Sequence, residues 1–243
     1  MPRVAEGPPE QTPSPMMVSL SLDAVYFCSA KHFLEALPPF QDAYARYRSE
    51  IEKGIRELQE IEVKYADDES GTGYDEMEPY CTKLDRDFQS FQFEAYPYIR
   101  TVATVHLLSV ACLEAHINIK AERSLTRYHF AEFDKLSLTG KWLFYPKLMG
   151  AKPFDPGREP FQSLRRLVGI RNVLVHYKER REGWRGYEVP RFIDSLGLTK
   201  TDADHSLGTA ERMIRELSAL QREPTPRWLA GGWVPVFELR TVE

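Results

Sequence analysis

The chain has 243 residues, of which 42% are hydrophobic and 28% charged, so it can bury a core as one large domain or two small ones. Its formal net charge is -4 and its pI is about 5.9, which excludes a globally basic nucleic-acid binder but not a local basic patch. Cys28, Cys81 and Cys112 are widely spaced and form no Cys-x-x-Cys pair. Neither a disulfide framework nor a zinc knuckle is indicated, and a reducing, cytoplasmic setting is expected.

The N-terminal part predicts a tail followed by a helical extension. Residues 1–16 are rich in Pro, Gly and Glu, so we expect a disordered tail. They have no apolar stretch of the kind found in a signal peptide. The helical extension is predicted over 17–79. It contains an amphipathic segment from Val18 to Leu37 and a long helix from Phe40 to about Ala66, whose apolar residues recur at helical spacing.

The next part, 80–222, predicts the main helical bundle. Its helices, including one that begins just before this boundary, are expected at 78–94, 98–124, 131–149, 161–181 and 201–220. Pro97 is expected to kink the pattern or to divide the first two of these helices. Thr201 followed by Asp204 resembles a helix-capping pair. The C-terminal tail, 223–243, contains the strand-like run VPVFEL, and the whole pattern predicts an all-α bundle of about six or seven helices.

The most apolar long stretch, Thr101 to Ile119, contains His106, Glu114 and His116. It therefore predicts a buried helix and no membrane span. Glu114 and Asn118 share a helix face that excludes His116, so a polar seam inside the bundle is preferred to a metal site. The sequence has no P-loop, dinucleotide-binding glycine motif or nucleophile elbow, and no cofactor or metal is expected.

Charge is unevenly distributed along the chain. Residues 50–94 contain 14 acidic and 5 basic side chains, whereas 158–191 contain 9 basic and 4 acidic ones. Solvated helix faces explain the acidic run most simply. The acidic part also has the charge to mask the basic segment or to dock a basic partner, and the sequence leaves both alternatives open.

The basic segment surrounds the run LRRLVGIRNVLVHYKERR, in which Arg171 and Asn172 precede His176. Arg, a polar residue and then His after a short spacer resembles the signature of HEPN domains, named for higher eukaryotes and prokaryotes nucleotide-binding. The resemblance implies an α-helical core over about 80–222 with the motif on a late helix. The run SVACLEAHINIKAE, in the preceding long helix, is similar to the early helix of the same bundle.

The resemblance implies metal-independent RNA cleavage by a homodimer whose two motif helices face each other, in a toxin or defence effector. Arg171 presents a planar cation suited to phosphate oxygens, and His176 exchanges a proton near neutral pH. Arg171 and His176 lie about 140° apart on an ideal helix, whereas Asn172 and His176 share a face. Three arrangements would let Arg171 and His176 act together: the long Arg side chain wraps round the helix, the helix is distorted, or the Arg acts across a dimer. A face-to-face dimer is the simplest of these, and Asn172 is assigned to orient the imidazole or the phosphate.

Basic and aromatic neighbours of the motif are candidates for guiding an RNA backbone. They are Arg165, Arg166, Tyr177, Lys178, Arg180 and Arg181. Two alternatives stand beside the nuclease. One is a non-catalytic HEPN-like dimer that binds RNA, a nucleotide or a protein partner such as an antitoxin. The other is a helical assembly protein in which the motif is structural.

Overall fold

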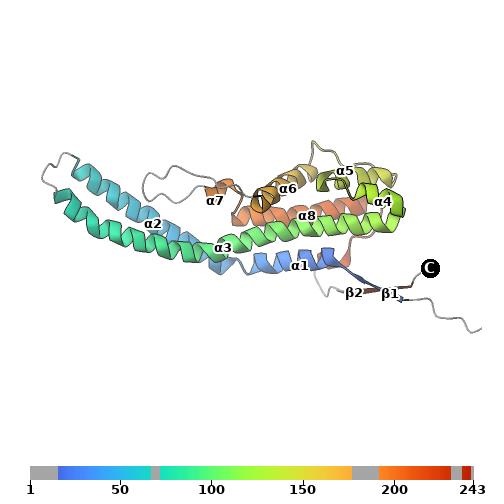
Figure 1. Cartoon of the computed structure of the whole chain (residues 1–243), viewed down its shortest axis with the longest axis horizontal. Coiled ribbons are helices and arrows are strands. Elements are labelled where there is room, and N and C mark those ends of the chain that lie inside the picture. Colours follow the sequence, from blue (N-terminus) through green and yellow to red (C-terminus); the bar gives the residue numbers. More distant parts are fainter. Residues whose placement is uncertain (1–15, 67–71, 177–191, 231–236, 242–243) are drawn as a thin grey trace, which may run out of the picture.

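The computed structural model describes residues 16–66, 72–176, 192–230 and 237–241, and it is an all-α bundle with one two-stranded ribbon (Figure 1). Within these residues there are seven α-helices of seven residues or more and one four-residue helix. In chain order the α-helices are α1 Leu22–Glu35, α2 Pro38–Lys64, α3 Thr72–Ser124, α4 Arg127–Phe133, α5 Leu138–Leu148, α6 Phe161–Val175, α7 Phe192–Ser195 and α8 Lys200–Gln221. A 3-10 helix, η1, covers Arg227–Ala230. The predicted all-α class is confirmed.

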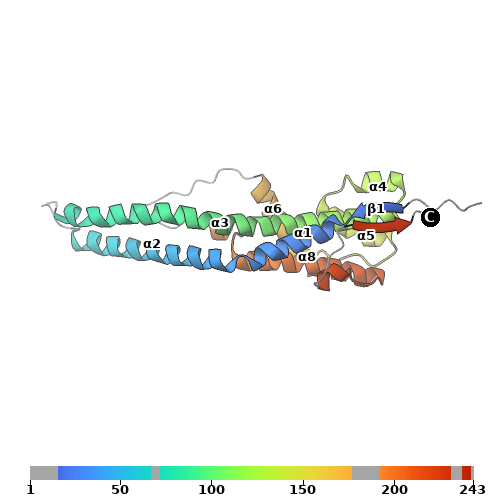
Figure 2. The same cartoon turned by 90° about the horizontal axis from the view of Figure 1, so that it is seen from below.

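Helix α3 runs along the long axis of an elongated molecule, and most of the other helices pack against it (Figures 1 and 2). Its first half pairs with α2 in a hairpin that projects beyond the rest of the protein. We call α2 together with residues 72–98 of α3 the arm. The second half of α3 packs against α1, α4, α5, α6 and α8, which together form the compact bundle.

Pro97 was expected to kink the helical pattern or to divide it into two helices, and the division is wrong. Pro97 lies inside α3, which runs from Thr72 to Ser124. An internal proline removes a backbone hydrogen bond and costs about 3 kcal/mol. The packing on both sides of it offsets this loss. Tyr44 of α2 contacts the ring of Phe91 at 5.4 Å and stacks on Tyr98 at 4.6 Å between ring centroids, so one buried side chain holds α3 before and after the proline.

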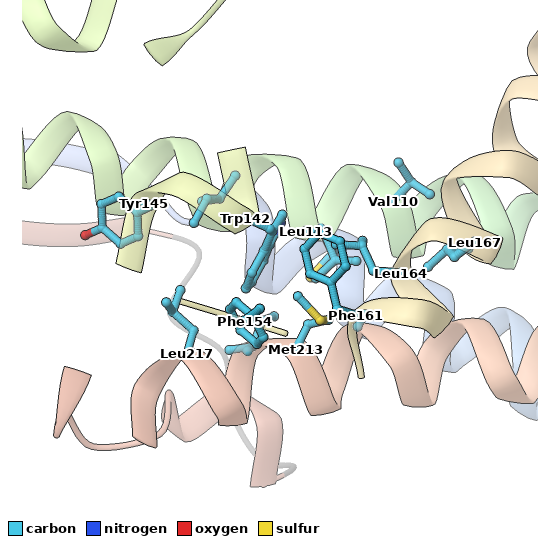
Figure 3. Close-up of a cluster of buried hydrophobic side chains, with 14 of the residues drawn as sticks. Val110, Leu113, Trp142, Tyr145, Phe154, Phe161, Leu164, Leu167, Met213 and Leu217 are labelled. Atoms are coloured by element: carbon cyan, nitrogen blue, oxygen red, sulfur yellow. The ribbon is translucent and has the colours of Figure 1, made fainter. Parts of the chain in front are cut away.

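The core has two clusters along α3. The bundle cluster includes Val110 and Leu113 of α3, and Trp142, Phe161, Leu164 and Met213 from the elements around it (Figure 3). The second cluster lies between α2 and the first half of α3 and continues to Leu198 and Ala203. The predicted division near residue 80 falls within α3, which continues through it.

Several helix boundaries differ from the prediction because short polar side chains cap helices that periodicity alone does not resolve. The single helix expected at 131–149 is two helices, since the Ser137 hydroxyl accepts from the backbone N–H of Gly140 at the start of α5. Helix α8 begins one residue earlier than expected. Its N-cap is Thr199, whose hydroxyl accepts from Asp202 N at 3.1 Å, in place of the predicted Thr201 and Asp204 pair.

The two ends of the described chain meet in a small ribbon. Strand β1, Met16–Leu20, pairs antiparallel with β2, Phe237–Thr241. The strand expected in VPVFEL is confirmed in its second half, and its first half lies outside the described residues. Val18 to Leu20, predicted as the start of a helix, are strand instead, because a partner strand more than 200 residues away supplies their backbone hydrogen bonds. Of the predicted tail 1–16, residues 1–15 lie outside the described residues, and Met16 is not in a tail but begins strand β1.

Among the residues that the structure describes, α3 is the one helix with the length and apolar composition to cross a membrane. Half of its most apolar window is buried against neighbouring elements. Its polar side chains His106 and His116 are buried at 0% and 3% exposure and take part in the interior hydrogen bonds described below. A core helix of a bundle has these same features.

Candidate functional site

Helix α6 presents one apolar and one basic face. Phe161, Leu164 and Leu167 are buried and contribute to the bundle core. Arg165 and Arg166 point away from that core and are exposed. The burial repeats every three residues because these positions fall on one side of a helix. This packing fixes α6 against α3 and α8 and carries the Arg–Asn–His motif at its C-terminal end.

The structure brings Arg171 and Asn172 together directly. Arg171 is half-buried, and its Nη1 donates to Asn172 Oδ1 at 3.0 Å. This bond holds the guanidinium at the exposed end of α6. Because Asn172 uses its side-chain oxygen in this way, its side-chain N–H groups remain the donors that it offers to a ligand.

His176 lies just beyond the helix, which was predicted to continue to residue 181. It is the C-cap, with φ -110° and ψ 37°, and its backbone N–H donates to Asn172 O at 2.9 Å. The separation of about 140° from Arg171 was expected for an ideal helix; the i→i−4 bond keeps the His176 backbone N–H on the helix, whereas its φ and ψ depart from helical values. The imidazole is exposed and forms no hydrogen bond with any residue that the structure describes. The adjacent Val175 is 50% exposed.

Two of the predicted RNA-binding residues can be placed. The Arg166 guanidinium donates to Asp202 Oδ1 at 2.8 Å, which ties α6 to the first turn of α8. Arg165 is exposed and has no ion pair with a described residue, so its charge faces solvent. The other four predicted residues lie outside the described part of the chain: Tyr177, Lys178, Arg180 and Arg181.

A shallow groove of about 320 Å³ runs between α6 and α8 beside the motif helix. Polar side chains from both helices line it, among them Gln162, Arg166, His205 and Thr209. A second hollow lies toward the motif, between Val173 of α6 and Gly197 before α8. The two hollows share Arg166 and Ile170, so they are neighbours along α6.

A buried histidine below this surface has a structural role that the sequence did not reveal. His106 Nε2 donates to Gly197 O at 2.8 Å, and its Nδ1 lies within hydrogen-bond distance, 2.7 Å, of the Ser206 hydroxyl oxygen. Burial lowers the pKa of His106, although the bond to Gly197 opposes that shift. The imidazole thus joins α3 to the turn before α8. Its partners lie about 100 residues away, so no local pattern marks them.

The second polar group of α3 is a seam inside the bundle. His116 Nδ1 and Asp23 Oδ2 are 2.8 Å apart. Lys141 is 3% exposed, and its Nζ donates to Asp134 Oδ1 at 2.7 Å and to Asn118 Oδ1 at 3.0 Å. These bonds satisfy polar groups that the core would otherwise bury unpaired. No set of three or more His, Cys, Asp or Glu side chains in the described ranges is arranged to hold a metal ion.

No family model, no curated protein and no solved structure matches this chain.

Proposed function

We propose that this protein is a metal-independent endoribonuclease of the HEPN type, active as a homodimer, with Arg171, Asn172 and His176 as its catalytic residues. The observation that carries the proposal is the exposure of the motif. The polar groups that hold the bundle together, such as His106 and Lys141, are buried and hydrogen-bonded. His176 instead faces solvent without a partner among the described residues, which is expected of a group that acts on a ligand.

The chemistry needs one proton exchanger and one fixed cation. The 2′-hydroxyl of RNA loses its proton as its oxygen attacks the adjacent phosphorus, and the leaving 5′-oxygen gains a proton. The products are a 2′,3′-cyclic phosphate and a 5′-hydroxyl. We assign proton transfer to His176 and stabilisation of the negative phosphorane to Arg171. The bond from Arg171 to the Asn172 side chain supports this assignment, because it limits the freedom of the guanidinium before RNA binds.

A homodimer supplies the second proton exchanger. One imidazole accepts the 2′-hydroxyl proton, and a second protonates the leaving oxygen in the same turnover if two motifs face each other. The half-exposed Val175 supports an interface at this end of α6, since an apolar side chain beside the motif gains from being covered.

The test is cleavage of total RNA in the presence of EDTA by wild-type protein and by His176→Ala. We expect wild-type cleavage and at least a 100-fold loss in the variant, with 2′,3′-cyclic phosphate ends on the products. His32→Ala is the matched control, because His32 is also exposed but lies on α1. Circular dichroism should show equal folding for all three proteins.

Two results would contradict the proposal. Absence of cleavage by wild-type protein, with RNA binding that weakens as salt increases, would indicate a non-catalytic RNA-binding module. Cleavage that survives His176→Ala would place the catalytic group elsewhere. In the binding module, charge reversal at Lys178, Arg180 and Arg181 should lower affinity for RNA.

A further inference from the structure

The face of α3 that points away from α2 carries a stripe of three exposed apolar side chains, which Arg100 interrupts between Tyr96 and Leu107. Phe93 is 80% exposed, Tyr96 64% and Leu107 38%. The first two are three residues apart and the last is eleven residues further on, so all three share one side of the helix. The opposite side, with Tyr98 and Val102, is buried. Exposed aromatic side chains that share a helix face with a further apolar residue mark an interaction surface.

We propose that a second copy of this chain covers this stripe, with the two α3 helices antiparallel and a twofold axis near residues 101 and 102. This register places Tyr96 opposite the partner's Leu107. It also places Phe93 within one residue of the partner's Ala111. The large side chains at one end of the stripe then fill the space beside the small ones at the other end. Such self-complementarity is what an interface between identical subunits requires.

Charge complementarity supports the same arrangement. The arm carries most of the acidic run of residues 50–94, which has 14 acidic and 5 basic side chains. Antiparallel pairing lays the arm of each copy along the bundle half of the other, beside α6. Glu78 and Asp85 of the arm are exposed and have no ion pair with a described residue, and the same is true of Arg165 on α6. With the axis between residues 101 and 102, Asp85 lies opposite residue 118 of the partner and Glu78 opposite residue 125, so the negative charge of the arm lies along the half of the partner that carries its basic helix α6.

The position of α6 along α3 determines where the two motifs lie in the proposed dimer. Val110 of α3 lies beside Leu164 and Leu167 of α6 (Figure 3). Val173 and Leu174, at the motif end of α6, pack on the cluster that contains Val102. The motif end of α6 therefore lies level with the proposed axis, and the dimer brings two motifs to its centre. The two Arg100 side chains also approach the axis, and each guanidinium lies 5.5 Å from the ring centroid of its own Tyr96, so each of these two like charges contacts an aromatic ring.

This inference shares the homodimer with the proposed function but does not require cleavage, so the two can fail separately. Its test is disulfide cross-linking between two variants that each carry one introduced cysteine, Tyr96→Cys and Leu107→Cys, in a chain that also carries Cys28→Ser and Cys81→Ser and keeps the buried Cys112. Copies of the same residue would lie about 16 Å apart along the helices. That distance is too long for a disulfide, which needs Cα atoms within about 7 Å.

We expect a covalent dimer only when the two variants are mixed and mildly oxidised, and at most a trace with either variant alone. Val63→Cys is the matched control. It is 77% exposed but lies on α2, so mixing it with either variant should give no cross-link. A cross-link of equal yield with each variant alone would overturn the proposed register.

Sedimentation equilibrium tests the interface without cysteines. Phe93→Glu should raise the dimer dissociation constant at least tenfold, whereas Val63→Glu should leave it unchanged. Both sites are exposed, so circular dichroism should show that both variants fold. A wild-type protein that stays monomeric at tens of micromolar would overturn the proposal, as would a dimer that Phe93→Glu does not weaken.

Discussion

Removing the carboxylate of Asp134 should destabilise the bundle more than removing the Lys141 charge that it pairs with. The Lys141 side chain is 3% exposed, whereas that of Asp134 is 55% exposed. In Asp134→Ala the ammonium stays buried with only Asn118 as a hydrogen-bond partner. In Lys141→Met the charge and its desolvation penalty both disappear, and an aliphatic chain of similar length fills the same space.

The structure sets the size of both effects. A hydrogen bond to a charged group contributes about 1.5–3 kcal/mol to stability. Solvent around Asp134 screens part of this interaction, so Asp134→Ala should cost about 1–2 kcal/mol. Lys141→Met should stay within about 1 kcal/mol of wild type. The double variant should resemble Lys141→Met, because the group that suffers from the loss of Asp134 is no longer charged.

Urea unfolding followed by circular dichroism measures these differences, and the Asp134→Ala melting temperature should fall by about 3–6 °C. An Asp134→Ala variant as stable as wild type would show that the carboxylate does not stabilise the buried ammonium. Additive effects of the two substitutions in the double variant would mean that the carboxylate and the ammonium do not interact.

Three further predictions concern other parts of the bundle. Burial lowers the pKa of His106 below its ordinary value near 6.5, so just below pH 6.5 only the unfolded chain binds this proton. The contribution of His106 to stability is therefore full above pH 6.5 and is lost as the pH falls through the folded-state pKa. Urea titrations at several pH values will measure this dependence, and His106→Asn should flatten it. Gly197→Ala should lower the stability of the fold by about 1–2 kcal/mol, because Gly197 has φ +71° and the new Cβ would lie 3.0 Å from Ile170 Cδ1. In contrast, a Cβ at Gly169 on α6 meets no atom within 4 Å, so Gly169→Ala should stabilise the fold by about 0.5–1 kcal/mol. Burial raises the pKa of the Cys112 thiol well above its usual range, so a thiol reagent at pH 8 should modify Cys112 only after unfolding.

Helical periodicity predicted most of the fold because each long helix buries one face. The spacing of Tyr44, Ile51 and Leu58 placed α2 almost at its observed bounds. The same pattern failed at the breaks between helices, since periodicity reports burial and does not detect caps. Ser137 ends one apolar run and starts the next through a single side-chain bond. The sequence feature that indicates this cap is a short polar residue three positions before Gly140, and helix propensity alone does not take it into account.

The remaining errors have a different cause, which is contact between distant parts of the chain. No local pattern shows that Tyr44 bridges Pro97 or that the start of the chain finds a strand near its end. The same limit applies to the site. Sequence placed Arg166 among the RNA-binding residues, but could not show that Asp202, on a different helix, accepts a hydrogen bond from its guanidinium.

The end of α6 shows why motif spacing alone could not give the geometry of the site. The basic residues after His176 have good helix propensity, so the sequence predicted a helix to residue 181. A helix in a bundle is held mainly by its buried face, and the residues of α6 that are fully buried end at Leu167, with Val173 and Leu174 half-buried. His176 follows this packed stretch and leaves helical geometry.

The exposed position of His176 allows loss of cleavage to be distinguished from loss of folding. A buried catalytic histidine would confuse loss of activity with loss of structure, because removing it would also leave a cavity or an unpaired polar group. His176 contributes no described side-chain hydrogen bond, so its removal should change cleavage alone. Arg171 differs, since its substitution also frees the Asn172 side chain that accepts its hydrogen bond. The comparison of His176→Ala with Arg171→Ala therefore distinguishes a lost proton exchanger from a disordered phosphate site: the first should abolish cleavage and preserve RNA affinity, and the second should lower both.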